Sequence, residues 1–425
     1  MMKHIYTSLD IGSDTIKIVV CELYQGKLNL LAASSYKSKG IKKGLITDVD
    51  LATKSIKGAI KEVEDMLDIK IKKIITSVPS FNAEYSIIKG NIKISNPEGI
   101  VTSEDVIKCL EVAAKTVSYA TREMVTILPV DYTIDDKSLT TNPKGERCNT
   151  LGCRAVLVTT PKKNIYSVVG LLEKIGIEVV DISINNIGDL YSFNNKNFED
   201  KVGAIINIGN DITSVSLYNK SILVKSSIID MGGKNVDSDI SYMYKVDIPT
   251  ARELKLKFAL AHKKNASVND IVEVKSATDN NLKINQFEIS EVVMSRLMEL
   301  LSEAKKEINL LTSRKIDYII ITGGTSNMQG FEYVVRDVFG DGANIGNVKM
   351  LGIRDNIYSS CIGNLVYFLS KLKLKGKNYT MISDDEVYQM TSINSRKVSS
   401  SDSMLGKIFG FFFTESQDET HRGGN

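Results

Sequence analysis

The stretch whose residue types best suit a chemical task is Leu9–Val20, LDIGSDTIKIVV, in which an apolar run ends in Asp10. A carboxylate at the mouth of a turn is suited to hold Mg²⁺ through water. Gly12 lets the backbone approach a ligand closely. The turn also offers small polar side chains and consecutive backbone N–H groups, which suit an anion; these residues are Ser13, Asp14 and Thr15. Taken alone, a structural hairpin explains the same pattern.

A second copy of the pattern changes this interpretation. Ala204–Leu217, AIINIGNDITSVSL, repeats it, so that Gly209 matches Gly12 and Asp211 matches Asp14. Apolar runs flank both turns, and each unit opens about half of the chain. An internal repeat of this kind predicts a duplicated domain, with a phosphate held between two facing turns.

Composition narrows the classes of function. The chain has 425 residues, of which 43% are hydrophobic and 25% charged, which is ordinary for a soluble protein with more than one core. A net charge of +3 creates no strong field for polyanions, so nucleic-acid binding is not favoured. No stretch reaches about 18 apolar residues, and the first apolar run is short, so we expect neither a spanning helix nor a signal peptide.

The cysteines and histidines do not predict a site. Five cysteines are present, and only Cys148 and Cys153 lie close together; no second pair or nearby histidine completes a zinc site. An odd count in a large chain is typical of reduced thiols, and the sequence assigns this pair no function. The three histidines are scattered, which disfavours a histidine-based catalytic or metal centre.

The elements that position the first turn follow in the order βββαβ. Strands are predicted on both sides of the turn and over Lys27–Ser35, followed by an amphipathic helix over Leu51–Leu67 and a buried strand over Lys73–Ser77. An inserted α+β block then interrupts the pattern, beginning with two strand candidates, Glu84–Lys89 and Asn91–Ile94. A helix and a strand after this block complete the first half.

The second half repeats the three-strand opening and continues into a mostly helical region, Val236 to Arg314. Its clearest helix, Ser290–Leu311, carries one apolar stripe, which we interpret as core packing. The strand Tyr318–Thr322 then ends in a Gly-Gly pair. Paired glycines after a buried strand let a helix N-terminus approach a ligand, although an ordinary loop explains them equally well.

The character of the chain changes towards its end. Residues 371–402 contain many Lys, Ser, Asp and Asn and few large apolar residues, which predicts a flexible linker. Residues 403–414, SMLGKIFGFFFT, have a broad apolar helical face that predicts an amphipathic membrane-targeting helix, and a polar tail, 415–425, follows. Docking onto the folded body or onto a partner is the alternative. We assign membrane contact to Met404, Leu405, Lys407, Ile408, Phe409, Phe411, Phe412 and Phe413.

Two phosphate hairpins, a Gly-Gly loop and an insertion in the first half resemble the superfamily of actin, hexokinase and heat-shock-chaperone ATPases. Within it, the chain resembles the bacterial cell-division FtsA family, over about residues 3–370 and in the tail. The stretches that carry the resemblance are LDIGSDTIKIVV, ILPVDYTIDD with NPKG, AIINIGNDITSVSLY, DMGGKNVDSDIS, IIITGGTSNMQGF and IRDNIYSSCIGNLVYFL. Their order and spacing together make the resemblance specific.

The resemblance implies an α/β fold of two actin-like lobes, which is a ribonuclease H-like duplication, with ATP and Mg²⁺ in the cleft between them. It also implies how the chain is divided. Residues 1–83 and 162–200 form the first lobe, 84–161 an inserted FtsA-type subdomain that contributes to polymer contacts, 201–235 and 313–370 the core of the second lobe, and 236–312 its helical subdomain.

On matching positions, the resemblance places Asp10, Gly12, Ser13 and Lys17 in the first phosphate loop, with Asp10 on the metal side and as the one candidate for catalysis. It places Lys255 near the adenosine. Together with the residues of both turns, the predicted nucleotide-binding set is Asp10, Gly12, Ser13, Asp14, Thr15, Lys17, Gly209, Asn210, Asp211, Thr213, Gly232, Gly233, Lys255, Gly323, Gly324 and Thr325.

In this family the protein ties the filament of the tubulin-like FtsZ to the inner face of the cytoplasmic membrane. FtsZ docks through its C-terminal peptide on the helical subdomain of the second lobe. The resemblance therefore implies a peripheral membrane protein of the septal Z ring at midcell, which polymerises and helps to recruit later division proteins. A single short anchor attaches weakly and an array attaches firmly, which agrees with a polymer. Filament geometry and the identity of the later partners stay open.

The second phosphate loop departs from the family pattern. Relatives usually have Asp-Ile-Gly-Gly-Gly-Thr where this chain has NIGNDI at 207–212. An amide in place of the carboxylate removes a general base and a metal charge, and two glycines that let the backbone touch phosphate now carry side chains. Arg252 occupies a slot that is often Glu, and Asn185 lies where relatives often have Glu. We therefore predict that nucleotide binding is retained but weakened and that hydrolysis is slow or absent.

The alternatives belong to the same superfamily. A sugar or acetate kinase needs a catalytic carboxylate facing the γ-phosphate and has no use for an aromatic tail after a linker. A pilus-assembly relative is actin-like and binds protein, but the tail and the ILPVDYTIDD stretch disfavour it. A chaperone is disfavoured because no β-rich substrate domain follows the ATPase body.

Overall fold

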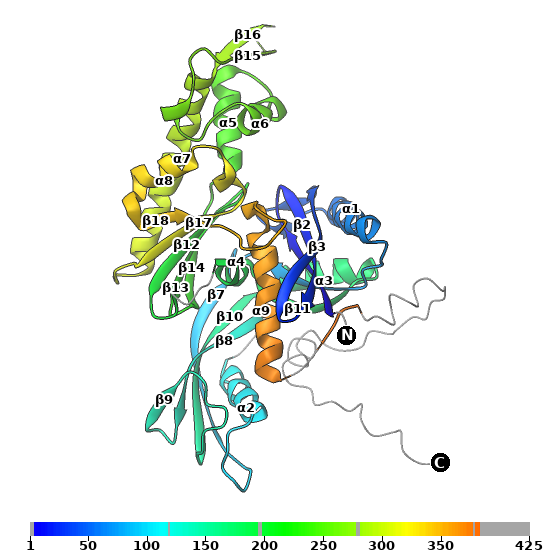
Figure 1. The fold of residues 1–425 in the computed structure, drawn as a ribbon, viewed down its shortest axis with the longest axis vertical. Coiled ribbons are helices and arrows are strands. Elements are labelled where there is room, and N and C mark those ends of the chain that lie inside the picture. Colours follow the sequence, from blue (N-terminus) through cyan, green and yellow to red (C-terminus); the bar gives the residue numbers. More distant parts are fainter. Residues whose placement is uncertain (1–3, 118–119, 194–197, 278–280, 377–378, 383–425) are drawn as a thin grey trace.

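The computed structural model describes residues 4–382 apart from 118–119, 194–197, 278–280 and 377–378 (Figure 1). The predicted membrane helix at 403–414 lies outside these residues, as does most of the predicted linker. Within the described part, none of the helices combines the length and the apolar character that crossing a bilayer requires.

The first half of the chain builds a five-stranded sheet. Its order is β11-β6-β1-β2-β3, in which β1, β2 and β3 form an antiparallel meander and β6 and β11 add in parallel. The predicted order βββαβ is confirmed, and the apolar face of the helix buries Ile56, Ile60 and Val63. The elements are β1 (His4–Ile11), β2 (Thr15–Tyr24), β3 (Lys27–Lys37), β4 (Ile41–Lys42), β5 (Leu45–Ile46), α1 (Val49–Leu67), β6 (Lys73–Val78), α3 (Lys162–Lys174) and β11 (Glu178–Ile184).

The second half builds a sheet of the same topology. Its order is β14-β13-β12-β17-β18, again a three-stranded antiparallel meander with two parallel additions. The duplication predicted from the two hairpins is therefore confirmed in the fold. The elements are β12 (Val202–Ile208), β13 (Thr213–Asn219), β14 (Ile222–Ile229), β17 (Tyr318–Thr322), α8 (Phe331–Phe339) and β18 (Ala343–Ile345).

The inserted block is a separate four-stranded sheet with one helix against it. Its strand order is β7-β10-β8-β9. The two predicted strands at its start are one continuous strand: Gly90 lets it continue beneath the helix, because a Cβ there would lie 2.5 Å from the carbonyl oxygen of Cys109. The predicted capping box of Thr102 and Asp105 is present. The elements are β7 (Glu84–Lys93), α2 (Ser103–Ala114), β8 (Arg122–Ile134), β9 (Ser138–Thr140) and β10 (Thr150–Pro161).

A helical block extends from the second sheet to the top of Figure 1. The apolar stripe of its longest helix is core packing, as predicted, since Val293, Leu297 and Leu300 are fully buried. A short hairpin that we did not predict precedes this helix. The elements are α5 (Gly233–Tyr244), α6 (Ile248–Lys257), β15 (Ile271–Val274), β16 (Leu282–Asn285) and α7 (Gln286–Leu311), with single 3₁₀ turns at Lys263–Asn265, Gly324–Asn327, Gly340–Gly342 and Asn356–Tyr358.

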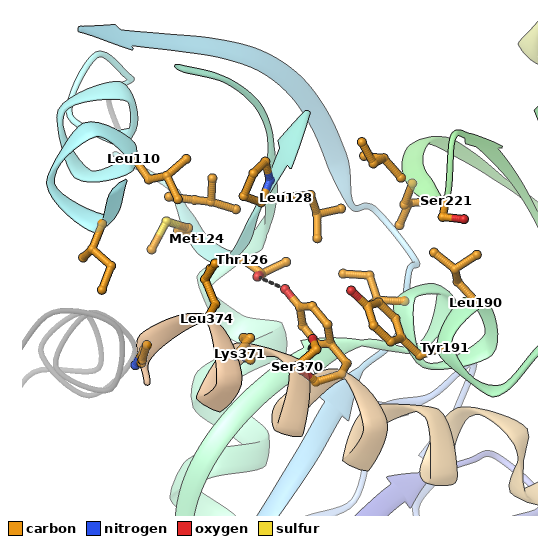
Figure 2. Close-up of a pocket in the computed structure, with 18 residues that line it drawn as sticks. Leu110, Met124, Thr126, Leu128, Leu190, Tyr191, Ser221, Ser370, Lys371 and Leu374 are labelled. Carbon is orange, nitrogen blue, oxygen red and sulfur yellow. Dashed lines mark hydrogen bonds between the residues drawn. The ribbon is translucent and has the colours of Figure 1, made fainter. Parts of the chain in front are cut away.

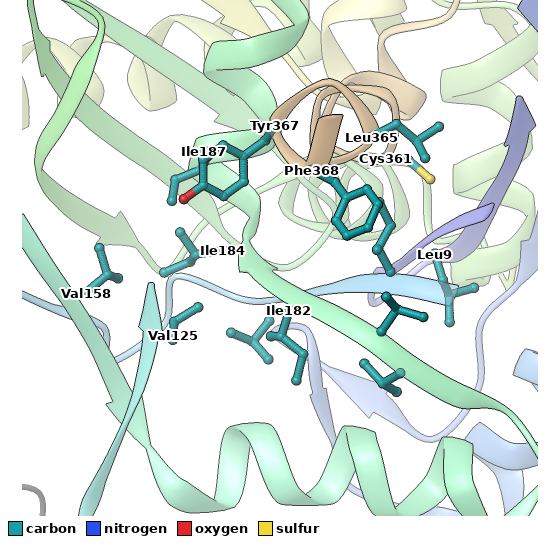
Figure 3. Close-up of a cluster of buried hydrophobic side chains, with 14 of the residues drawn as sticks. Leu9, Val125, Val158, Ile182, Ile184, Ile187, Cys361, Leu365, Tyr367 and Phe368 are labelled. Atoms are coloured by element: carbon teal, nitrogen blue, oxygen red, sulfur yellow. The ribbon is translucent and has the colours of Figure 1, made fainter. Parts of the chain in front are cut away.

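Two helices, α4 (Asn185–Phe193) and α9 (Ser359–Lys375), pack against each other where the two halves meet. A small, mostly apolar cavity of about 130 Å³ lies between them and the inserted block, and there the Tyr367 hydroxyl bonds Thr126 Oγ1 at 2.7 Å (Figure 2). Phe368 and Leu365 of α9 point into the core above the first sheet (Figure 3). Helix α9 thus returns the chain to the first half.

This helix corrects the predicted start of the linker. Residues 371–375 are the last turn of α9, and the side chain of Lys371 is buried. Beyond the helix, Ile382 forms a bridge with Ile5 at the edge of β1. The chain therefore stays on the folded body at least to Ile382.

Candidate functional site

One cavity of about 610 Å³ lies between the two hairpins and is lined by both halves of the chain. Its volume falls in the range of ligand pockets, roughly 300–1,000 Å³. Gly232 and Thr213 do not line it. The predicted residues that do are Asp10, Gly12, Ser13, Asp14, Thr15, Lys17, Gly209, Asn210, Asp211, Gly233, Lys255, Gly323, Gly324 and Thr325.

The first hairpin holds Asp10 between two donors. Asp10 and Lys17 lie opposite each other on β1 and β2, and Lys17 Nζ is 3.0 Å from Asp10 Oδ2. The amide of Asn185, at the start of α4, donates to Asp10 Oδ1 at 3.3 Å. The lysine folds over the turn, since a Cβ on Gly12 would lie 2.7 Å from Lys17 Nζ. Asp10 is therefore buried, with both carboxylate oxygens engaged.

The second hairpin is packed against the N-terminus of α5. The amide of Gly233 donates to the carbonyl of Gly209 at 2.9 Å, and the amide of Lys234 donates to the carbonyl of Asn210 at 2.9 Å. A Cβ on Gly232 would lie 2.5 Å from the carbonyl oxygen of Gly209. Thr213 is buried and donates to the carbonyl of Met231 at 2.8 Å. Gly232 and Thr213 therefore support the turn from behind.

Lys255 of α6 also lines the cavity, and it is buried between a carboxylate and a backbone carbonyl. Its Nζ lies 2.6 Å from Asp237 Oδ1 and donates to the carbonyl of Gly233 at 2.8 Å. Burial lowers the pKa of Lys255 and raises the pKa of Asp237, while their mutual attraction opposes both shifts. Gly323 has φ +91, and a Cβ there would lie 2.5 Å from the carbonyl oxygen of Ile208. The glycine loop therefore passes directly against the second hairpin.

Charged side chains bridge the cavity between the two halves. Arg252 of α6 pairs with Asp14 of the first turn, which also receives Lys37 Nζ at 2.5 Å. Burial opposes ionisation of Asp14, but hydrogen bonds from Lys37 and Arg252 outweigh it and lower the pKa of this carboxyl. Lys43, in the turn between β4 and β5, reaches the second hairpin: its backbone amide donates to Asp211 Oδ2 at 3.0 Å.

The structure adds a buried carboxylate that we did not predict. Asp189 of α4 accepts hydrogen bonds from Asn207 Nδ2 at 2.7 Å and from the hydroxyls of Ser359 and Ser360 at 2.9 and 2.7 Å. Burial raises the pKa of Asp189 to about 6. The amide at 207 therefore satisfies this carboxylate. In the sequence, the amide at position 207 was the one residue of this contact that we had singled out.

The residues present do not fit a magnesium ion held by the protein. Asp10, the predicted metal residue, already accepts from Lys17 and Asn185. Asn207 presents an amide and turns its Nδ2 towards Asp189. Mg²⁺ prefers anionic oxygen donors, and here these are already engaged.

Comparison with known proteins identifies the family. A model of the cell division protein FtsA matches residues 204–363, and a model of the SHS2 domain inserted in FtsA matches residues 83–159. FtsA of Bacillus subtilis is 25% identical over 394 residues, covering 92% of this chain and 89% of that protein. FtsA of Streptococcus pneumoniae is 27% identical, with 88% and 84% covered. The chain belongs to the FtsA family.

Solved structures confirm the predicted actin-like fold of this FtsA-family chain. A chain of the PilM-PilN type IV pilus biogenesis complex superposes with a TM-score of 0.56 at 13% identity, covering 85% of this chain and 98% of that one. MreB5 of Spiroplasma citri bound to ADP superposes with a TM-score of 0.54 at 13% identity, covering 88% and 99%. The inserted SHS2 domain corresponds to the predicted α+β insertion. The chain is thus an actin-like cell division protein.

Proposed function

We propose that this protein binds ATP between its lobes, polymerises, and anchors the FtsZ ring to the inner face of the cytoplasmic membrane at midcell, where it helps to recruit later division proteins. The observation that carries the proposal is the cavity between the duplicated hairpins, in a chain of the FtsA family. MreB5, which shares the fold, was solved with ADP. A cavity of this size, lined by backbone turns and cations, suits a nucleotide.

The helical subdomain offers a surface for the FtsZ peptide. Apolar side chains stand in solvent on α5 and α6, and exposed apolar groups of this kind suit a docking peptide. Lys245 Nζ lies 4.1 Å from the ring centroid of Tyr242 and adds a cation at this surface. The exposed side chains are Tyr242 at 76%, Met243 at 61% and Ile248 at 44%.

Hydrolysis of the bound nucleotide is expected to be slow. Asn207 cannot act as a general base, and Asp10, the one carboxylate that we considered for catalysis, is tied to Lys17. Purified protein should therefore release phosphate from ATP at a rate close to that of a no-enzyme control. Brisk magnesium-dependent release, measured with a coupled phosphate assay, would contradict this prediction.

The proposed anchoring is tested by measuring whether the chain carries an FtsZ peptide to a lipid membrane. A fluorescent peptide with the C-terminal sequence of FtsZ is mixed with anionic liposomes and sedimented. The full chain should bring the peptide into the pellet. A chain that lacks residues 403–425, and one with Phe409→Ser, Phe411→Ser and Phe412→Ser, should bind the peptide in solution but leave it in the supernatant.

The matched control is the double variant Tyr242→Ser and Met243→Ser in the full chain. It should sediment with liposomes without the peptide, because the tail is intact and the docking surface is not. Equal sedimentation of the full and shortened chains would rule out the tail as the anchor. Absence of peptide binding by the full chain would rule out FtsZ as the partner.

A further inference from the structure

We propose that this cleft binds a nucleoside triphosphate without a divalent cation, and that Arg252 exchanges Asp14 for the phosphates when the nucleotide binds. The inference rests on the proposed nucleotide binding and concerns how the phosphate charge is neutralised. The observations behind it are the cations in the cavity, the partners they now have, and the hydrogen bonds that already engage the carboxylates of Asp10 and Asp211.

Two partly buried cationic side chains line the cavity beside the first turn, one from each lobe. Lys17 lies on β2 and Arg252 on α6 of the helical subdomain, whereas the ammonium of Lys43, between β4 and β5, is paired with Asp230 at 2.6 Å. The side chains of Lys17 and Arg252 are 13% and 28% exposed. Partly buried cations attract an anion more strongly than exposed ones, because less water screens them. The cavity thus supplies from its own side chains much of the charge that a metal ion brings to phosphates.

Asp14 now occupies the place of an anion in this cluster. It stands on the turn whose backbone N–H groups suit phosphate, and it holds Arg252 of the other lobe together with Lys37 of its own. A guanidinium binds phosphate in a bidentate manner, which makes phosphate a strong competitor for it. When Arg252 moves to the phosphates, Asp14 keeps its bond from Lys37 at 2.5 Å. The exchange therefore leaves no carboxylate without a cation.

The carboxylates of the cavity are not arranged to share a metal ion. Both oxygens of Asp10 are engaged, by Lys17 and by Asn185. Asp211 accepts from the Lys43 amide at 3.0 Å and from Asn210 Nδ2 at 3.0 Å. Because Asn185 and Asn207 are neutral while Arg252 is a cation, the side chains of this cavity can meet phosphate charge directly.

The test measures the affinity of the full-length protein for a fluorescent, slowly hydrolysed ATP analogue by anisotropy, in millimolar Mg²⁺ and in excess EDTA. We expect the two dissociation constants to agree within about threefold. Arg252→Glu should weaken binding in EDTA by about tenfold or more, because it removes a charge-assisted contact and adds a repulsive carboxylate. In that variant Mg²⁺ should restore part of the affinity.

Two further variants show whether a change in affinity comes from the cavity or from a general loss of structure. Asp14→Asn removes the internal competitor and should tighten binding in EDTA by about threefold, a gain that a misfolded protein cannot show. Arg314→Glu, which makes the same charge change at an exposed site outside the cavity, should bind like the wild type.

The possible outcomes distinguish failure of this inference from failure of the proposed nucleotide binding. Binding in Mg²⁺ that disappears in EDTA for the wild type would overturn the inference and leave the proposed nucleotide binding intact. Weaker binding by Asp14→Asn would overturn the exchange. No binding of the analogue in either buffer would overturn both the inference and the proposed nucleotide binding.

Discussion

Gly363→Ala is expected to lower the free energy of unfolding by about 3–5 kcal/mol, because it forces apart the two helices that join the lobes. A Cβ on Gly363 of α9 would lie 1.6 Å from the carbonyl oxygen of Gly188 in α4 and 2.9 Å from the amide nitrogen of Ser192. All of these neighbours are backbone atoms, so no side chain can rotate away. The reverse contact is also too close for a Cβ, since one on Gly188 would lie 2.4 Å from the carbonyl oxygen of Ser360.

Chemical denaturation followed by circular dichroism measures this effect. The matched control is Gly170→Ala, in the exposed face of α3, where a Cβ would meet no atom within 4 Å. That change should raise the free energy of unfolding by about 0.5–1 kcal/mol, because alanine loses less backbone entropy than glycine in a helix. A Gly363→Ala protein as stable as the wild type would show that the helices do not pack as described.

Lys371→Met is expected to destabilise the protein by about 3–5 kcal/mol at neutral pH, because it removes the cation that directly bonds the buried carboxylate of Asp181 and leaves only the more distant Lys375. Lys371 of α9 pairs with Asp181 of β11, and both side chains are 4% exposed. Burial raises the pKa of Asp181 and lowers the pKa of Lys371, with the attraction of the pair opposing both shifts. Lys371 Nζ also lies 4.6 Å from the ring centroid of Tyr367.

The pH dependence of the Lys371→Met variant identifies the mechanism. Without the lysine, the folded-state pKa of Asp181 stays above its unfolded value, so stability is lost as the pH rises and recovered as it falls. The deficit relative to wild type should therefore be smaller at pH 5 than at pH 7. Adding Asp181→Asn should recover most of the loss, whereas Lys70→Met, which removes an exposed ammonium from Glu64, should change stability little. A deficit independent of pH would point to lost packing instead.

Local signals were enough to predict the strands, the main helices and the duplication. Apolar runs that flank a Gly turn recur in both halves, and the alternation of buried and exposed positions depends only on neighbouring residues. The family resemblance supplied most of the predicted nucleotide residues, and most of these line one cavity. Two of them, Gly232 and Thr213, lie behind the second hairpin, because the sequence shows which residues belong to a turn but not which side of it faces the cavity.

The errors came from partners far away in the chain. Lys371 looked like the start of a solvated linker because its neighbours in sequence are polar, yet Asp181, its partner, lies 190 residues earlier. Gly90 looked like a break between two strands, whereas it is the point where α2 crosses one strand. The neighbouring residues in the sequence do not show whether a charged residue or a glycine is buried. Burial of such a residue depends on the group that it contacts in the folded protein.

The sequence alone determined the actin-like fold class, the family resemblance and the loss of a carboxylate at position 207. Only the tertiary structure decided which groups Asn207 and the nearby charged residues contact. It turns Asn207 towards the buried Asp189, 18 residues earlier, and it places Arg252 on Asp14, 238 residues away. Electrostatic interactions act through space and depend on burial, so the charge balance of a cleft between two lobes appears only when both lobes are in place.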